Sequence, residues 1–270
     1  MKKLFKEIYI IWLREMIRYW RTKPRLISSL AMPLIWLVLF GSGMKSAFAI
    51  GGGQAGFDFI QFLFPGVIGM SILFTSIFSV MSIVTDRQFG FLKEILVAPV
   101  SRVSIALGKI LGGSTTAMIQ GTIMILLSPI VGIKLSLGLV LAMLPVMFIA
   151  SIALTSIGLV VASRMKSAEG FQMIMNFIMM PMFFLSGAMF PLSNLPNWMD
   201  ILSKINPASY AIDLVRQVSF KFMDTPTQVI DLLSIDLFGH QVNLWTDLLI
   251  VSVFGVIMVT FGVFLFNKSD

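Results

Sequence analysis

The chain has 270 residues, of which 57% are hydrophobic and 12% are charged, and its formal net charge is +7. With a mean hydropathy of +0.93 it has too few polar residues to cover a water-soluble globule, so the composition excludes a soluble protein and indicates an integral membrane protein. The sequence contains no cysteine, which excludes disulfides and thiolate metal sites.

The N-terminal segment, residues 1–25, predicts an amphipathic helix that lies in the headgroup region of the membrane. At 100° per residue, five charged side chains fall on one face and apolar side chains spread over the rest. The charged set is Lys3, Glu7, Arg14, Arg18 and Arg21. The apolar core begins only at Leu26, so we do not expect a cleavable signal peptide. The helix is either a topology anchor alone or also part of a cytoplasmic docking surface.

Six apolar stretches follow, and each is long enough to cross about 30 Å of hydrocarbon as a helix. They predict spans at about 26–44, 59–84, 106–133, 136–163, 170–190 and 247–266. We therefore expect an all-α integral membrane protein with six transmembrane helices, in which residues 26–270 form one domain. Prolines inside these stretches predict kinks, because neighbouring groups in a bundle can satisfy the carbonyls that proline frees. They are Pro33, Pro65, Pro129, Pro145 and Pro181.

The distribution of charge predicts the orientation of the chain. Fifteen of the 20 lysines and arginines fall on the side that holds both termini and the loops after spans two and four. The opposite side holds five basic and seven acidic residues. By the positive-inside rule, both termini of this multi-pass protein lie in the cytoplasm, below a cell inner or plasma membrane.

A charged amphipathic segment, residues 86–101, separates spans two and three. Gly90 and Pro99 bracket about two helical turns that place three apolar residues on one face. These are Leu92, Ile95 and Leu96. From spacing alone this cytoplasmic helix is either an ordinary interfacial connector or a lever that converts the push of a partner into motion of both spans.

The segment after span five, residues 191–209, predicts short re-entrant helices on the extracellular side. Its apolar residues are too few to cross the membrane, so it dips into the outer leaflet and returns against the other spans. It is either an external gate or a lid that fixes the ends of the spans. The following stretch, 219–245, is acidic, and its sequence assigns it no role.

Three motifs carry a resemblance to a known family. DRQFGFLKEILVAPVSR (86–102), FLFPGVIGMSILF (62–74) and FLSGAMFPLSNLPNWMDILSKINPASYAIDLVRQ (184–217) resemble segments of type-2 ABC exporter permeases, especially those for daunorubicin resistance and nodulation-factor export. They cover about a quarter of the chain, in the family's order. Many members carry a small residue and then an acid after the glycine, where this chain has Phe91 and Lys93, so the resemblance leaves open which charge meets the partner.

The resemblance implies a permease subunit that works as a dimer with two nucleotide-binding ATPase subunits. A homodimer is expected, with a heterodimer of sister permeases left open, in contact with membrane lipid and without nucleic acid. No phosphate-binding loop occurs in the sequence, since the GK pair at Gly108 and Lys109 has Val103 where the first glycine should be. We therefore expect no enzyme activity and no cofactor in this chain, with ATP and Mg bound by the partner.

The resemblance also implies roles for particular residues. Coupling to the ATPase falls on Asp86, Arg87, Phe89, Gly90, Phe91, Leu92, Lys93, Glu94, Leu96, Pro99 and Ser101. The extracellular gate falls on Phe184, Ser186, Gly187, Phe190, Pro191, Leu195, Pro196, Trp198, Asn206, Pro207 and Tyr210. If span five lines the path of the cargo, the path residues are Gln172, Asn176, Met180 and Phe183.

The expected function is export of a hydrophobic or amphipathic molecule, of drug, lipid or glycolipid type. An ion-coupled carrier is disfavoured because the charge-free cores of the spans offer no site for a coupling ion. A membrane enzyme is disfavoured because no carboxylate pair falls in a span. The alternative is a membrane scaffold or channel whose cytoplasmic helix binds a partner that is not an ATPase.

Overall fold

The computed structural model describes residues 2–43, 59–91, 100–192, 195–223, 225, 230, 233–237 and 240–268, except the side chains of Arg25, Ser42 and His240. Its helices are α1 (Lys2–Arg21), α2 (Lys23–Gly43), α4 (Phe59–Ser79), α5 (Met81–Gln88), α7 (Arg102–Leu126), the 3₁₀ helix η1 (Ser128–Val131), α8 (Leu137–Ala162), α9 (Ala168–Phe184), α10 (Asn197–Ile205), α11 (Pro207–Phe222) and α13 (Leu244–Lys268). Two-residue strands, β1 (Asp236–Leu237) and β2 (His240–Gln241), pair as an antiparallel hairpin. The described part of the chain is thus all-α apart from this hairpin.

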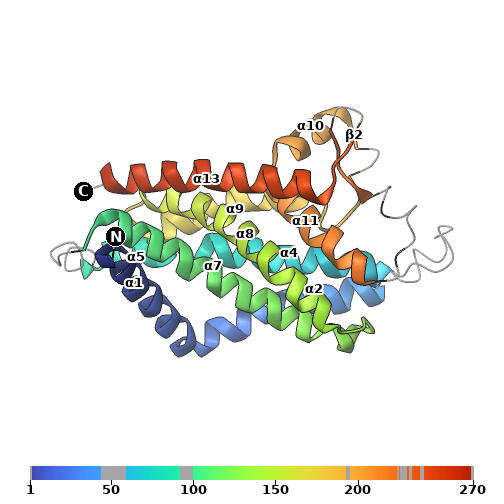
Figure 1. Ribbon diagram of the computed structural model, residues 1–270, viewed down its shortest axis with the longest axis horizontal. Coiled ribbons are helices and arrows are strands. Elements are labelled where there is room, and N and C mark those ends of the chain that lie inside the picture. Colours follow the sequence, from blue (N-terminus) through green and yellow to red (C-terminus); the bar gives the residue numbers. More distant parts are fainter. Residues whose placement is uncertain are drawn as a thin grey trace.

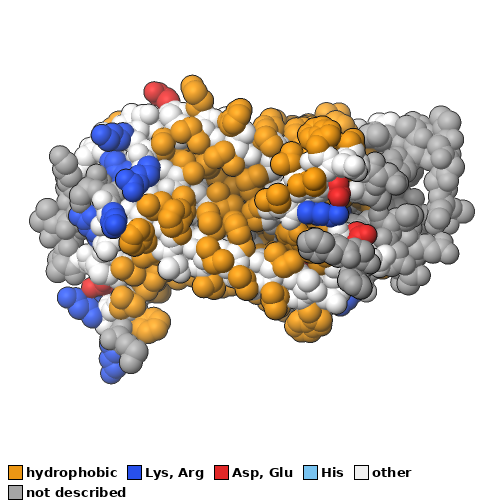
Figure 2. All heavy atoms as spheres, turned by 90° about the horizontal axis from the view of Figure 1, so that it is seen from above, with side chains coloured by type: hydrophobic (Ala, Val, Ile, Leu, Met, Phe, Trp, Pro, Cys, Tyr) orange, Lys and Arg blue, Asp and Glu red, His pale blue; other side chains and the backbone are white. Residues whose placement is uncertain are grey.

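The long helices lie side by side in an elongated bundle (Figure 1). Both termini lie at one end, called here the terminal end, together with α5. The hairpin, α10 and α11 lie at the opposite end, called the far end. Hydrophobic side chains cover the middle of the face seen in Figure 2, while lysines and arginines gather toward the terminal end. A wide apolar surface with basic residues at one end is typical of a membrane protein.

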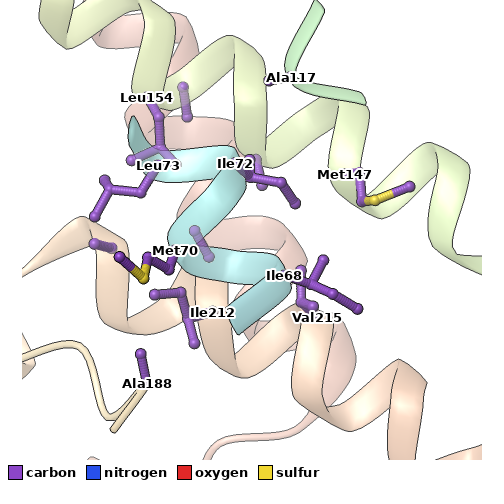
Figure 3. Packing of buried hydrophobic residues seen from close by; sticks show 14 of the residues in the cluster. Ile68, Met70, Ile72, Leu73, Ala117, Met147, Leu154, Ala188, Ile212 and Val215 are labelled. Carbon is purple, nitrogen blue, oxygen red and sulfur yellow. The ribbon is translucent and has the colours of Figure 1, made fainter. Parts of the chain in front are cut away.

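Helix α4 is the centre of the bundle. Fifteen of its 21 residues are buried, because it is apolar on all sides and other helices surround it. In Figure 3 its side chains pack against Met147 and Leu154 of α8 and Ile212 and Val215 of α11. Glycine permits the closest approach, since a Cβ at Gly66 would overlap the backbone of Ala188. The first half of α4 therefore holds the segment that follows α9.

Among the described residues, three helical stretches are long and apolar enough to cross a membrane. They are α8, α13 and Phe59–Gln88, which joins α4 and α5. Helices α1 and α2 meet at 70° and provide a fourth if they are taken as one broken span. An all-α membrane protein is thereby confirmed, whereas the six predicted spans are not. Helix α9 has only 17 residues where the prediction was 170–190, and α7 carries many Gly, Ser and Thr residues that lower its hydropathy.

Helix α1 is amphipathic, as its sequence predicts, and packs on α7. Its buried face consists of Ile11, Glu15, Met16 and Tyr19. The contact is close because α7 presents glycine there: a Cβ at Gly108 would lie 2.6 Å from the Cβ of Ile11, and one at Gly112 would lie 2.8 Å from the Cβ of Glu15. Most of the other apolar side chains of α1 are exposed, as expected for a helix at a membrane surface.

Candidate functional site

A cavity of about 580 Å³ opens between α1, α2, α4, α7 and α9. Its walls hold six apolar or aromatic residues, Tyr19, Met32, Pro33, Met70, Phe74 and Phe78, and eight polar ones, Ser28, Ser29, Ser71, Thr75, Thr116, Gln120, Gln172 and Asn176. None of these lining residues is charged. The size falls within the range of small-molecule sites, and such a wall suits a neutral amphipathic ligand.

The polar groups of the wall divide into two kinds. Gln120 is buried and bridges three helices, because it accepts a hydrogen bond from Thr75 Oγ1 at 2.6 Å and donates one to the carbonyl oxygen of Ser29. Gln172 and Asn176 on α9 are exposed and make no hydrogen bond within the described part of the chain. Their amides are therefore free to donate to and accept from a ligand.

Two of the four predicted path residues lie on this cavity and two do not. Gln172 and Asn176 line it, whereas Met180 is 54% exposed and is not part of the wall. Phe183 is 2% exposed and packs edge-on against the ring of Phe74, with ring centroids 5.8 Å apart. Phe183 therefore contacts the cavity only indirectly, through Phe74. It belongs to the buried face of α9, on which every fourth side chain is buried.

At the terminal end, α5 carries three consecutive residues that each contact a different part of the bundle. We call Asp86, Arg87 and Gln88 the junction. Asp86 is 2% exposed. Its carboxylate lies 2.8 Å from Arg18 Nη2 and 3.4 Å from Arg14 Nη2 of α1, and 3.2 Å from Lys109 Nζ of α7.

A second carboxylate joins this charge cluster. Lys109 Nζ lies 2.7 Å from Glu15 Oε1 and donates to Ser82 Oγ at 2.8 Å. Ser82 Oγ in turn donates to Glu15 Oε2 at 3.2 Å. Lys109 is 3% exposed and Glu15 is 9% exposed, so both charges are removed from water and depend on each other for compensation.

The other two junction residues hold the corner between α8 and α9. Arg87 Nη1 donates to the carbonyl oxygen of Ala162, the last residue of α8, at 3.0 Å and to that of Met165, in the turn that follows, at 2.6 Å. Gln88 Oε1 accepts a hydrogen bond from the backbone N–H of Ala168, the first residue of α9, at 2.9 Å. These contacts join α5 directly to the start of the helix that carries Gln172 and Asn176.

The structure describes six of the predicted coupling residues. Asp86 and Arg87 face into the bundle, whereas the rings of Phe89 and Phe91 are 70% and 53% exposed on either side of Gly90. Gly90 has a φ of 83°, in the left-handed region that favours glycine. Ser101 caps α7, and its backbone N–H donates to Glu7 Oε2 of α1 at 3.1 Å. The remaining predicted residues lie outside the described part: Leu92, Lys93, Glu94, Leu96 and Pro99.

The residues predicted to form the gate lie around the end of α9. The end of α9 at Phe184 leaves carbonyls that no helical N–H reaches. Side chains of the next segment satisfy them: Asn206 Nδ2 donates to Met182 O at 2.7 Å, and Ser209 Oγ donates to Leu185 O at 3.0 Å. Helix α11 is thereby fastened to the end of α9.

The other predicted gate residues differ in burial. Ser186, Gly187 and Tyr210 are buried; Phe190, Pro191, Leu195 and Pro207 are partly buried; Phe184, Pro196 and Trp198 are exposed. Gly187 has a φ of 75°, which permits the turn after α9. Tyr210 donates its hydroxyl hydrogen to Lys204 O and so closes α11 onto α10. Residues 197–205 and 207–222 are helices, so the second one extends well past the predicted boundary at 209.

Sequence reasoning missed the buried charges. Lys109 lies just before a charge-free run and was assigned to the start of span three, and Asp86 lies just after one and was assigned to the coupling segment, so neither was placed in a buried cluster. It also missed Arg216, which donates to the carbonyl oxygen of Gly187. A signal was present, because Asn206, Ser209, Asp213 and Arg216 are spaced three or four residues apart and share one face of a helix.

Comparison with known proteins gives consistent matches over most of the chain. Residues 6–220 match the family described as ABC-2 type transporter. The putative transport permease ycf38 of Cyanophora paradoxa is 30% identical over 215 residues, which cover 78% of this chain and 73% of that protein. Nodulation protein J of Rhizobium meliloti (strain 1021) is 28% identical over 77% of this chain and 79% of its own length. The inner membrane transport permease YadH of Escherichia coli (strain K12) is 27% identical over 80% of this chain and 84% of its own.

Proposed function

The chain belongs to the ABC-2 type transporter family, and from this premise we propose that it is the permease subunit of an ATP-driven exporter of a neutral amphipathic molecule. The observation that carries the proposal is the cavity of about 580 Å³, whose α9 wall starts at the corner held by Arg87 and Gln88. Apolar side chains bind the hydrophobic part of the cargo, and the free amides of Gln172 and Asn176 bind its hydroxyl, carbonyl or amide groups. Because no lining residue is charged, a formally charged group on the cargo gains no partner there.

Energy comes from a separate ATPase that binds ATP and Mg, since the chain has no phosphate-binding loop. The helix that the sequence predicts within residues 86–101 is the docking helix for this subunit in this proposal, and the exposed rings of Phe89 and Phe91 belong to its described part. When the ATPases draw together, the docking helix moves with them. Arg87 and Gln88 pass this motion to the α8–α9 corner, while Asp86 anchors α5 to α1 and α7.

The proposed topology has six spans with both termini in the cytoplasm. Lysines and arginines gather toward the terminal end on the face seen in Figure 2, as the positive-inside rule requires of a cytoplasmic face. Helix α1 lies at the membrane surface with its basic residues toward anionic headgroups. The far end then faces outward, and the segment from Gly187 to Tyr210 closes the exit of the path.

A second copy of the chain completes the path in this proposal. Helix α9 leaves large apolar side chains exposed next to the polar amides, among them Met173 at 75% and Phe177 at 81%. Helices α2 and α9 border the cavity, so a homodimer packed on this side encloses it. Two ATPase subunits then dock on the two terminal ends.

Single-cysteine labelling tests the function, because the natural chain has no cysteine. Asn176→Cys is labelled with an uncharged maleimide in membranes that contain the chain with its co-purifying ATPase, without nucleotide and with ATP plus vanadate. We expect nucleotide to change the labelling rate at this position. The control is Leu249→Cys on α13, which is 64% exposed and remote from the cavity, and its rate should stay constant.

Arg87→Gln separates coupling from assembly. This variant loses the charge that holds the carbonyls of Ala162 and Met165, so we expect ATPase binding to persist while the nucleotide effect at Asn176→Cys disappears. If no nucleotide-binding protein co-purifies in mild detergent, or if nucleotide leaves the labelling of Asn176→Cys unchanged, the proposal is refuted in favour of a scaffold or channel.

A further inference from the structure

A second buried charge cluster lies at the far end, where the proposed transport steps do not use it. Asp213 and Arg216 of α11 are each 2% exposed, and Asp247 in the first turn of α13 is fully buried. Arg216 Nη1 lies 3.7 Å from Asp213 Oδ1. The cluster therefore contains two carboxyl groups and one guanidinium. With both carboxyls ionised it would hold one uncompensated negative charge away from water, which is costly.

The hydrogen bonds around Gln217 independently indicate that the two carboxyl groups are not both ionised. Its Nε2 atom lies 2.7 Å from Asp213 Oδ2, 2.7 Å from Asp247 Oδ2 and 3.2 Å from Val242 O. An amide nitrogen carries only two hydrogens, so it cannot serve three acceptors fully. The remaining oxygens, Asp213 Oδ1 and Asp247 Oδ1, have no hydrogen-bond donor among the described residues. Each carboxyl group of the pair thus has one oxygen without a donor, although Arg216 Nε is itself a donor without an acceptor among the described residues.

We propose that Asp213 and Asp247 form a proton-binding site, in which one proton is held between the two carboxyl groups while the far end is closed. The two carboxyl groups converge on one atom, since Oδ2 of each lies 2.7 Å from Gln217 Nε2, so a proton held between them supplies a donor and removes the excess charge. This site does not depend on the transport function proposed above. Only its exposure to the outside of the cell follows from the proposed orientation.

The surroundings of the pair contain few other ionisable groups. On α11 these are Arg216 and Tyr210, whose hydroxyl donates to Lys204 O. The stretches of α4 and α8 that pack on α11 are free of ionisable residues, and α4 contributes the ring of Phe62, 5.2 Å below the guanidinium of Arg216. In the hairpin, Asp236 is exposed, and the side chain of His240 lies outside the described atoms.

Proton binding is linked to closure because the same cluster holds the end of α9. Arg216 donates to the carbonyl oxygen of Gly187 and approaches that of Leu233 at 3.5 Å. Burial raises the pKa of Asp213 above its usual range, against the opposing effect of Arg216. A group whose pKa is raised in the closed state stabilises that state at low pH, and the stabilisation is lost as the pH rises through the raised pKa. Separation of α11 from α13 hydrates the pair and releases the proton.

Infrared spectroscopy of the full-length protein tests this directly, since a protonated carboxyl group has a carbonyl stretch that a carboxylate lacks. At about pH 8, where ordinary carboxyls are ionised, we expect one such band in the natural protein and its loss in both Asp213→Asn and Asp247→Asn. Asp200→Asn, in a partly exposed ion pair with Lys204, is the matched control and should retain the band.

Thermal unfolding provides a second measurement. The natural protein should lose melting temperature as the pH rises from about 7 to about 10, and Asp247→Asn should show a smaller loss because it has no proton to release. If one variant does not fold, the natural protein alone still decides the matter. Absence of the band in it at pH 8, or persistence of the band in a folded Asp213→Asn or Asp247→Asn variant, overturns the proposal.

Discussion

Removal of the Lys109 ammonium group is the sharpest test of how α1 is held to the bundle. In Lys109→Met the side chain keeps its approximate length but loses the charge that lies 2.7 Å from Glu15 Oε1 and 3.2 Å from Asp86 Oδ2. Asp86 still has Arg18 at 2.8 Å. Glu15 keeps only the hydroxyl of Ser82, so its charge becomes uncompensated while α1 stays docked.

Breaking a buried ion pair in this way costs about 3–5 kcal/mol. We take about 3 kcal/mol, because Arg14 and Arg18 are partly exposed and remain near the cluster. Since about 1.4 kcal/mol corresponds to a factor of ten, separation of α1 from α7 should become about a hundredfold more frequent. Ile11→Cys reports it, because Ile11 is 6% exposed and packs on Gly108, so a thiol there is labelled only after α1 has moved away.

A double variant distinguishes this mechanism from a general loss of stability. Adding Glu15→Gln removes the stranded charge, so labelling should return most of the way to the natural rate. Lys204→Met serves as the control, since its ion pair with Asp200 is partly exposed and contributes at most about 1 kcal/mol. Labelling of Lys109→Met at the natural rate, or a double variant that labels as fast as Lys109→Met, refutes the reasoning.

Three further predictions follow from single sites. Gly90→Pro, which cannot adopt the φ of 83° at that position, and Leu92→Asp should abolish ATPase docking while membrane insertion stays intact; normal pull-down of the ATPase by either variant contradicts the assigned docking helix. Asn206→Ala removes both the cap of α11 and the donor to Met182 O, so it should cost about 2–3 kcal/mol in thermal unfolding, with the exposed Asn197→Ala as an unaffected control. The hydroxyl of Ser104 and the backbone N–H of Ser101 hold the pKa of Glu7 below its usual range, so this contact should persist at neutral pH and weaken as the pH falls below about 4; a Glu7→Gln variant with the same acid dependence of its melting temperature would show that Glu7 is not responsible.

The sequence by itself determined the class of the protein, its helical content and most of its segments. Composition required a membrane environment, and the runs of apolar residues located the helical stretches because only a helix satisfies its own backbone groups in hydrocarbon. The amphipathic pattern of α1 was equally clear from its period. The motif residues also identified the family, and Gln172 and Asn176 stood out as the few polar groups of a Met- and Phe-rich helix.

Only the tertiary structure decided which of these residues act together. No periodicity links Glu15, Asp86 and Lys109, which come from three helices and meet because glycines on α7 let α1 approach. Asp213 and Asp247 are likewise far apart in the sequence, and no local pattern indicates that the side-chain nitrogen of Gln217 contacts both carboxyl groups. A local sequence pattern indicates whether a segment prefers water, the membrane or the boundary between them. Which buried charges pair depends instead on how segments that are distant in the sequence pack, so the tertiary structure is needed to identify the pairs.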